Sequence, residues 1–215
     1  MTRSLTALVA VVAFGAALLG VPTKALAAGG QVRGGDLFLT RTGGRCAVGF
    51  TVVGGFVTSG RCGRAGDPAL ASTGVVMGVF QASSFPGNDY AWVRLNPGWT
   101  PVGEVRRYPG VVAVTGVSSA PVGAAVCRSG PTTGWRCGTV TAKNATIVYP
   151  EGTVSGLTRT TACAGAGDTG GPFLAGTLAQ GLLSGGSGNC STGGTTYFQP
   201  IGEILAAFGL TLLTA

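Results

Sequence analysis

Short β-rich runs separated by turn residues dominate the chain between residues 30 and 198. Helical periodicity is nearly absent there, while Gly, Pro, Asn and Ser recur between the runs. Glycine alone supplies 40 of the 215 residues. About ten to twelve short strands at this spacing are typical of an all-β barrel or sandwich. The strands are expected at 47–53, 56–59, 75–80, 90–95, 102–108, 111–117, 124–127, 135–141, 145–149, 154–161, 178–184 and 195–199.

The tail is the one segment with a helical pattern. Ile201, Ile204, Leu205 and Phe208 fall on one face of a helix expected at 201–209. We expect this face to pack on the β structure. Prolines at 97–101 indicate a linker between two halves, at about 34–97 and 98–200. No internal repeat is found.

The first 27 residues have the layout of a secretory signal peptide. Arg3 precedes an apolar run from Leu5 to Val21, and Ala25-Leu26-Ala27 fits a small-x-small cleavage site. A run of this length is also nearly long enough for an uncleaved membrane anchor, although the Ala-rich end favours cleavage. Cleavage would leave residues 28–215 as a secreted domain, which we expect to be monomeric and free of the membrane.

All six cysteines follow the predicted signal peptide. An even number of cysteines in an exported chain indicates disulfides. No Cys-x-x-Cys spacing occurs, so neither a zinc site nor a dithiol redox pair is expected. Several pairings are possible, and the spacing alone leaves the choice open. The cysteines are Cys46, Cys62, Cys127, Cys137, Cys163 and Cys190.

The chain contains no histidine. No reaction step can therefore use an imidazole as a general base, and no metal can take an imidazole ligand. We expect no metal and no cofactor. The formal net charge of +7 is scattered along the chain without a basic run. This scatter does not favour nucleic-acid binding.

The densest glycine cluster runs from Cys163 to Pro172. Gly165–Gly170 matches G-x-G-x-x-G, but no helical pattern follows it, so dinucleotide binding is not favoured. Glycines beside Thr169 instead favour a tight turn that presents this residue. The amides of Gly167 and Thr169 could then point into one concavity, as in an oxyanion hole. An ordinary glycine-rich turn beside a disulfide is the alternative.

Five segments carry a more specific signal. They are Thr58-Ser-Gly-Arg-Cys62, Asn88-Asp-Tyr-Ala-Trp-Val-Arg94, Cys127-Arg-Ser-Gly-Pro-Thr-Thr-Gly-Trp135, Gly167-Asp-Thr-Gly-Gly-Pro172 and Ser184-Gly-Gly-Ser-Gly-Asn-Cys190. Together they resemble the bacterial chymotrypsin-like serine endopeptidases of the streptogrisin and alpha-lytic protease group, over residues 34–213. The resemblance implies two six-stranded antiparallel β-barrels and a short C-terminal helix.

The same resemblance implies roles for individual residues. Asp89 would take the position of the acid in the catalytic triad. Arg128 would pair with a buried Asp168 and hold the oxyanion loop in shape. The strand edge at Ser184, Gly185 and Gly186 would pair with an extended peptide. The implied disulfides are Cys46–Cys62, Cys127–Cys137 and Cys163–Cys190.

Two residues depart from the pattern of that group. Arg61 stands where the group has its histidine, and Thr169 stands where it has its serine. Arginine stays protonated and offers no acceptor, so it cannot replace the imidazole. Thr169 is internal and has no terminal amine to activate it. We expect the Arg61 side chain to form a salt bridge with Asp89 that fills the site.

The sequence therefore favours a protein without enzymatic activity, a pseudoprotease that binds an extended peptide or a protein. An inert exported protein that kept only the fold is one alternative. A hydrolase with non-standard groups is another, and it would need a base from Asp89 or from a bound partner. The barrel-like sequence begins within about ten residues of the predicted cleavage site, which leaves no room for a folding pro-segment.

Overall fold

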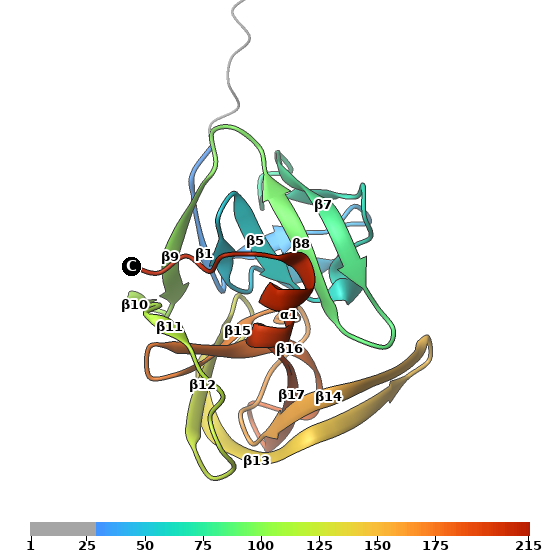
Figure 1. Cartoon of the computed structure of the whole chain (residues 1–215), viewed down its shortest axis with the longest axis vertical. Coiled ribbons are helices and arrows are strands. Elements are labelled where there is room, and N and C mark those ends of the chain that lie inside the picture. Colours follow the sequence, from blue (N-terminus) through green and yellow to red (C-terminus); the bar gives the residue numbers. More distant parts are fainter. Residues whose placement is uncertain (1–28) are drawn as a thin grey trace, which may run out of the picture.

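Two seven-stranded sheets form most of the protein in a computed structural model, which describes residues 29–215 (Figure 1). The signal peptide expected at 1–27 lies outside these residues. Within the described part of the chain, no helix combines the length and the apolar character needed to cross a membrane. The all-β class expected from the glycine-punctuated strands is confirmed.

The first sheet has the strand order β3-β2-β6-β7-β8-β5-β4. Its inner face buries Phe38, Phe56 and Phe80, and the Phe38 ring contacts the rings of the other two. Burial of such rings, at about 25 cal/mol per Å² of apolar surface, is the main stabilising contribution of this half. Its strands are β2 (Leu37–Leu39), β3 (Arg45–Ala47), β4 (Thr51–Val52), β5 (Gly55–Thr58), β6 (Pro68–Leu70), β7 (Val76–Ser84) and β8 (Tyr90–Leu95).

The second sheet has the strand order β11-β16-β15-β12-β13-β14-β17, and β16 also pairs with β17. A separate cluster around Phe173, Leu183 and Phe198 fills this half. Its strands are β11 (Gly116–Val117), β12 (Ala125–Gly130), β13 (Gly134–Tyr149), β14 (Gly152–Thr160), β15 (Pro172–Ala175), β16 (Leu178–Asn189) and β17 (Gly193–Pro200).

A third, three-stranded sheet contains the chain segment between the halves. Its order is β1 (Gln31–Gly34), β9 (Thr100–Arg106) and β10 (Val111–Ala113). The β1–β9 and β11–β16 pairings are parallel. The topology thus adds parallel edge pairings and a seventh strand per sheet to the expected antiparallel six-stranded barrels.

The strand expected at 47–53 is interrupted in the structure. The chain leaves the ladder after Ala47, and the Ala47 N–H donates to the carbonyl oxygen of Thr169 at 2.8 Å. A Cβ atom at Gly49 would lie 2.3 Å from Leu182 of the other half. Close approach of the two halves overrides strand propensity here, and it places Thr169 beside the first sheet.

The helix expected at 201–209 is α1 (Ile201–Phe208). Ile201 and Ile204 are buried against β16 and β17, as the apolar face predicted. The Phe208 ring meets the Tyr90 ring edge-on, with 5.2 Å between centroids. Because Tyr90 is the first residue of β8 and directly follows Asp89, this contact joins the C-terminal helix to the strand that begins next to Asp89.

Three disulfides are present, and their pairing is the one that the resemblance implied. Cys46–Cys62 joins β3 to a short 3-10 helix at Gly60–Cys62. The other two lie in the second half, where they brace β12 against β13 and the glycine-rich segment against the end of β16. They are Cys127–Cys137 and Cys163–Cys190.

Candidate functional site

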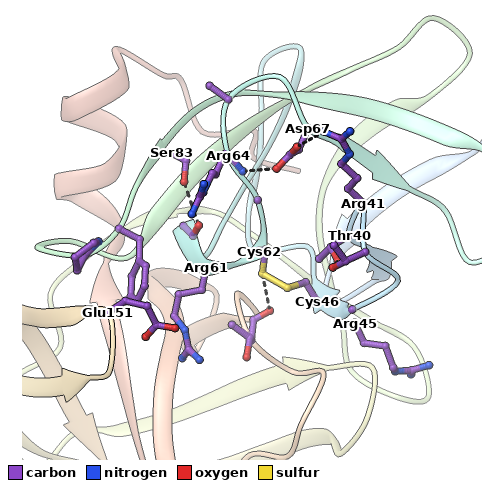
Figure 2. A pocket seen from close by; sticks show the side chains of 18 residues that line it. Thr40, Arg41, Arg45, Cys46, Arg61, Cys62, Arg64, Asp67, Ser83 and Glu151 are labelled. Atoms are coloured by element: carbon purple, nitrogen blue, oxygen red, sulfur yellow. Dashed lines mark hydrogen bonds and ion pairs between the residues drawn. A yellow bond between two sulfur atoms is a disulfide. The ribbon is translucent and has the colours of Figure 1, made fainter.

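A cleft lies where the two halves meet. It consists of a larger cavity of about 1000 Å³ and a smaller one of about 390 Å³. Arg61 and Thr169 line both cavities, so the two form one continuous depression. Figure 2 shows the larger cavity around the Cys46–Cys62 disulfide. The structure thus brings together two of the three residues that the resemblance placed at a catalytic centre.

Asp89 is the third, and it is completely buried behind Arg61. The Ser59 hydroxyl and the Arg61 backbone N–H donate to Asp89 Oδ1 at 2.5 and 3.2 Å. The Asp89 backbone N–H donates to Gln199 Oε1 at 3.0 Å. Among residues 29–215, no group in hydrogen-bonding geometry donates to Asp89 Oδ2. Oδ2 is therefore a buried acceptor that no well-aligned hydrogen bond reaches, although the Ser184 hydroxyl lies near enough to stabilise the ionised carboxylate.

Burial raises the pKa of Asp89 above its usual value. The hydroxyls of Ser184 and Ser59 and the nearby Arg61 oppose this rise but do not cancel it. The cause is that a carboxylate loses its hydration when it enters a low-dielectric interior. Among residues 29–215, no cationic side chain forms an ion pair with this carboxylate to offset that loss.

We expect this burial to make stability depend on pH. Between the unfolded and folded pKa values of Asp89, the folded state keeps a proton that the unfolded chain has released. The free energy of unfolding therefore falls as the pH rises through that interval, and the cost is complete above it. The Asp89→Asn variant lacks this titration, so the melting temperature of the variant should rise relative to that of the wild type as the pH increases above the usual aspartate pKa. Calorimetry of both proteins across that range would contradict the expectation if their difference stayed constant.

The Arg61 side chain does not pair with Asp89, so the expected salt bridge is wrong. The four salt bridges found in residues 29–215 do not include this pair. The guanidinium instead crosses the cleft, and its Nη1 donates to the carbonyl oxygen of Ser184 at 3.3 Å. It also lies over the Tyr149 ring, 4.4 Å from the centroid. A half-exposed aromatic face and a carbonyl are available at lower desolvation cost than a carboxylate in the interior.

Thr169 stands on a turn that contacts the first half of the chain. Gly170 has φ +86°, and a Cβ atom there would lie 2.1 Å from Thr58 Oγ1. The Gly170 N–H donates to the Leu183 carbonyl oxygen at 2.8 Å. No hydrogen bond from the Thr169 hydroxyl to another group of residues 29–215 is found, and the same holds for the amides of Gly167 and Thr169. The turn thus offers two free amides and a hydroxyl with no neighbouring base.

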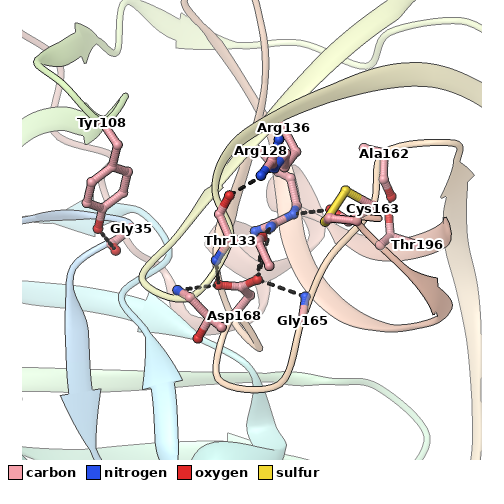
Figure 3. A network of polar contacts seen from close by, with 12 residues as sticks. Gly35, Tyr108, Arg128, Thr133, Arg136, Ala162, Cys163, Gly165, Asp168 and Thr196 are labelled. Carbon is pink, nitrogen blue, oxygen red and sulfur yellow. Dashed lines mark hydrogen bonds and ion pairs between the residues drawn. A yellow bond between two sulfur atoms is a disulfide. The ribbon is translucent and has the colours of Figure 1, made fainter. Parts of the chain in front are cut away.

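A buried ion pair holds this turn in place (Figure 3). Arg128 Nη2 donates to Asp168 Oδ2 at 2.9 Å, and neither side chain is exposed. Asp168 also accepts from the backbone of Thr132, Thr133 and Gly165, at 2.9, 3.3 and 2.9 Å. Desolvation lowers the pKa of Arg128, although Asp168 opposes it. Both carboxylate oxygens accept hydrogen bonds, which is the condition under which a buried carboxylate is tolerated. Arg128 Nη1, in contrast, has no hydrogen-bond partner among residues 29–215.

Ser184, Gly185 and Gly186 lie on β16 at the wall of the smaller cavity. β17 pairs with one side of this segment, whereas β15 ends at the register of Leu182 on the other side. Within the described residues, the second side of 184–186 therefore has no strand neighbour. Arg61 is the one charged residue among those lining this cavity. The remaining lining is small and neutral.

Several residues of the site could not be found from sequence. Tyr149 bonds to Ser184 through its hydroxyl at 3.1 Å and supports Arg61, yet it is 35 positions away. Gln199 reaches Asp89 across 110 positions. Ser59 lies in the segment Thr58–Cys62 that carries part of the family resemblance, but its hydrogen bond to Asp89 could be seen only in the folded structure. No local pattern marks any of the three.

Comparisons with known proteins agree with this geometry. The model of the trypsin family matches residues 70–207, a range that includes Asp89 and Thr169 but not Arg61. Streptogrisin-C of Streptomyces griseus is 53% identical over 190 residues, which cover 86% of this chain and 42% of that protein. Glutamyl endopeptidase 2 of the same organism is 40% identical over 190 residues, covering 86% of this chain and 97% of that protein. The chain spans about half the length of streptogrisin-C and streptogrisin-D, at 42% and 47%.

Solved structures are also similar to this chain. Cellulomonas bogoriensis chymotrypsin has a TM-score of 0.82 and 54% identity, with 86% of this chain and 100% of that chain covered. Thermobifida fusca protease A has a TM-score of 0.81 and 48% identity, with the same 86% and 100% covered.

Proposed function

Since the chain belongs to the trypsin family of serine endopeptidases, we propose that it is an exported pseudoprotease that binds extended peptides without cleaving them. The single observation that carries the proposal is the state of Asp89 Oδ2. It is a buried acceptor that no well-aligned hydrogen bond from residues 29–215 reaches, at the place where the family's imidazole would bond. The residue next to it in space, Arg61, directs its side chain elsewhere.

The chemistry of the cleft supports the absence of hydrolysis. Acyl transfer at a hydroxyl needs a base that takes its proton and returns it to the leaving group. Arg61 cannot accept a proton. Asp89 is buried behind Arg61, and the Thr169 hydroxyl donates no hydrogen bond to any group of residues 29–215. The two free amides at the turn and the binding surface would leave only a weak residual rate.

The free side of β16 supports peptide binding. An extended peptide can add to 184–186 as a further strand and place its side chains in the smaller cavity. The Ser184 carbonyl oxygen already accepts a hydrogen bond from Arg61 at 3.3 Å. A peptide N–H that takes this acceptor must first displace the guanidinium. Arg61 therefore competes with the peptide, and it can swing out because it is exposed.

Export is part of the proposal. Three disulfides and no free cysteine among residues 29–215 are typical of proteins that fold in an oxidising compartment. The segment at 1–27 has the layout of a signal peptide.

Binding without turnover is the expected result of a direct test. The protein is mixed with fluorescent, quenched decapeptide libraries, which report cleavage, and with labelled decapeptides, which report binding by anisotropy. In strand pairing, every second amide of the peptide donates a hydrogen bond to the neighbouring strand. N-methylation of that set of alternate amides should abolish binding, whereas N-methylation of the other set should leave binding intact.

Cleavage of the quenched libraries at an enzymatic rate would overturn the inactivity. Absence of binding to every library would favour an inert protein. Binding that tolerates N-methylation of either set of alternate amides would exclude strand addition as the mode of recognition.

A further inference from the structure

We propose that the larger cavity selects acidic peptide segments, so that the ligand of this cleft carries Asp or Glu at one end. The inference rests on the proposed function and names the class of ligand. Four arginines line the larger cavity: Arg41, Arg45, Arg61 and Arg64. Charged residues make up only 10% of the chain, which makes this a strong local concentration. Figure 2 shows the four arranged around the Cys46–Cys62 disulfide.

Within the part of the chain that the structure describes, the carboxylates of the cavity form an ion pair with only one of these arginines, Arg41. Asp67 accepts from Arg41 Nη1 at 3.5 Å and from the backbone N–H of Arg64 at 2.9 Å. Glu151 also lines the cavity but forms none of the ion pairs found in residues 29–215. Within the described chain, the guanidinium groups of Arg45, Arg61 and Arg64 therefore have no carboxylate partner.

The position of Arg45 connects this charge to the turn that bears Thr169. A Cβ atom at Gly167 would lie 3.3 Å from Arg45 Cβ and 3.4 Å from its Nε. The Arg45 side chain thus lies against the glycine whose amide is free. An acidic side chain near Thr169 would meet two charged donors, Arg45 and Arg61, as well as neutral amides. Guanidinium groups bind carboxylates through paired hydrogen bonds, which suits this arrangement.

Continuity with β16 favours a peptide over other polyanions. Arg61 and Thr169 line both cavities, so a chain that pairs with 184–186 runs directly into the basic cavity. The smaller cavity contains no charged residue except Arg61. The basic character is therefore confined to one end of the cleft, and acidic residues should matter at one end of the peptide only.

The test uses labelled random decapeptides with three fixed Glu residues in either the first or the second half, and matched libraries with Gln at those positions. We expect one Glu library to bind about tenfold more tightly than its Gln counterpart, and the other to gain little. Raising the ionic strength from about 0.05 to about 0.5 M should remove most of the gain.

A pair of double variants assigns the effect to the cavity. Arg45→Gln with Arg64→Gln should reduce the Glu preference to about twofold or less. Arg107→Gln with Arg159→Gln removes the same charge from exposed residues outside the cleft and should leave the preference unchanged. Neither pair touches the 184–186 edge, so binding of the Gln libraries should persist in both.

Each other outcome overturns the inference. If the Gln libraries bind and Glu in neither half increases the affinity, the proposed peptide binding is supported and the proposed selection of acidic segments is wrong. If no library binds, both the peptide-binding function and the selection of acidic segments are contradicted. A Glu preference that survives in the Arg45/Arg64 variant would exclude the cavity as its source. Tighter binding of a single-stranded oligothymidylate than of either Glu library would indicate a general polyanion surface instead.

Discussion

The Arg61→His/Thr169→Ser double variant is expected to cleave peptides with kcat/KM at least about a thousandfold above that of the wild type. The parts that such a change needs are already in place. Asp89 Oδ2 is buried and receives no well-aligned hydrogen bond from the described part of the chain, so it can accept the Nδ1–H of an imidazole at position 61. The turn at Thr169 is held by Arg128 and Asp168, and its amides are free to stabilise an oxyanion.

Both substitutions are required for this gain because the two groups act as a unit. Thr169→Ser alone supplies a less hindered hydroxyl but no base, and it should remain silent. Arg61→His alone supplies the base but leaves the methyl group of Thr169 at the reacting hydroxyl. Non-additivity of this kind is normal for residues that share one proton transfer.

The measurement is initial cleavage of the quenched decapeptide libraries by the four proteins side by side. The matched control is Arg61→Ala/Thr169→Ser, which opens the cleft and supplies a serine without a base. It should stay at the wild-type level. A double variant that unfolds at the wild-type temperature yet remains silent would show that more than these two groups has been lost. Cleavage by the alanine control would reveal a base outside position 61.

Asp168→Asn is expected to lower the free energy of unfolding by about 3–5 kcal/mol. It removes the charge that compensates Arg128, whose side chain is fully buried. Both Asp168 oxygens accept hydrogen bonds from N–H groups. In the variant, the NH₂ group of Asn replaces one of these acceptors and faces N–H donors without being able to accept from them. A loss of this size is a large part of the stability of an ordinary domain.

Urea unfolding monitored by intrinsic fluorescence measures this loss. The matched control is Arg41→Gln, which breaks an ion pair whose arginine side chain is 73% exposed, and it should cost less than about 1 kcal/mol. The same Asp168→Asn protein should also bind decapeptides more weakly, because the turn with Thr169 loses its support. A loss under about 1 kcal/mol would mean that water or a rearranged Thr133 replaces the pair.

The local sequence predicts much of the architecture. The glycine-punctuated β runs predict the all-β class, and the spacing of Ile201, Ile204 and Phe208 predicts α1. These features depend on the period of apolar residues and on backbone preferences, which act over a few positions. The strand bounds were less predictable: 135–141 and 145–149 form one strand, β13, whereas 47–53 is split where Gly49 packs against Leu182.

The residue types at the site were also determined by the sequence alone. A chain without histidine, with arginine at position 61 and threonine at position 169, carries no imidazole wherever its side chains lie. Which way Arg61 points was decided only by the tertiary structure. The sequence favoured Asp89 as its partner by charge, but the fold buries that carboxylate and offers the Ser184 carbonyl and the Tyr149 ring at the surface of the cleft. Charge attraction is a property of residue types, whereas desolvation depends on where chain segments more than a hundred residues apart come to lie.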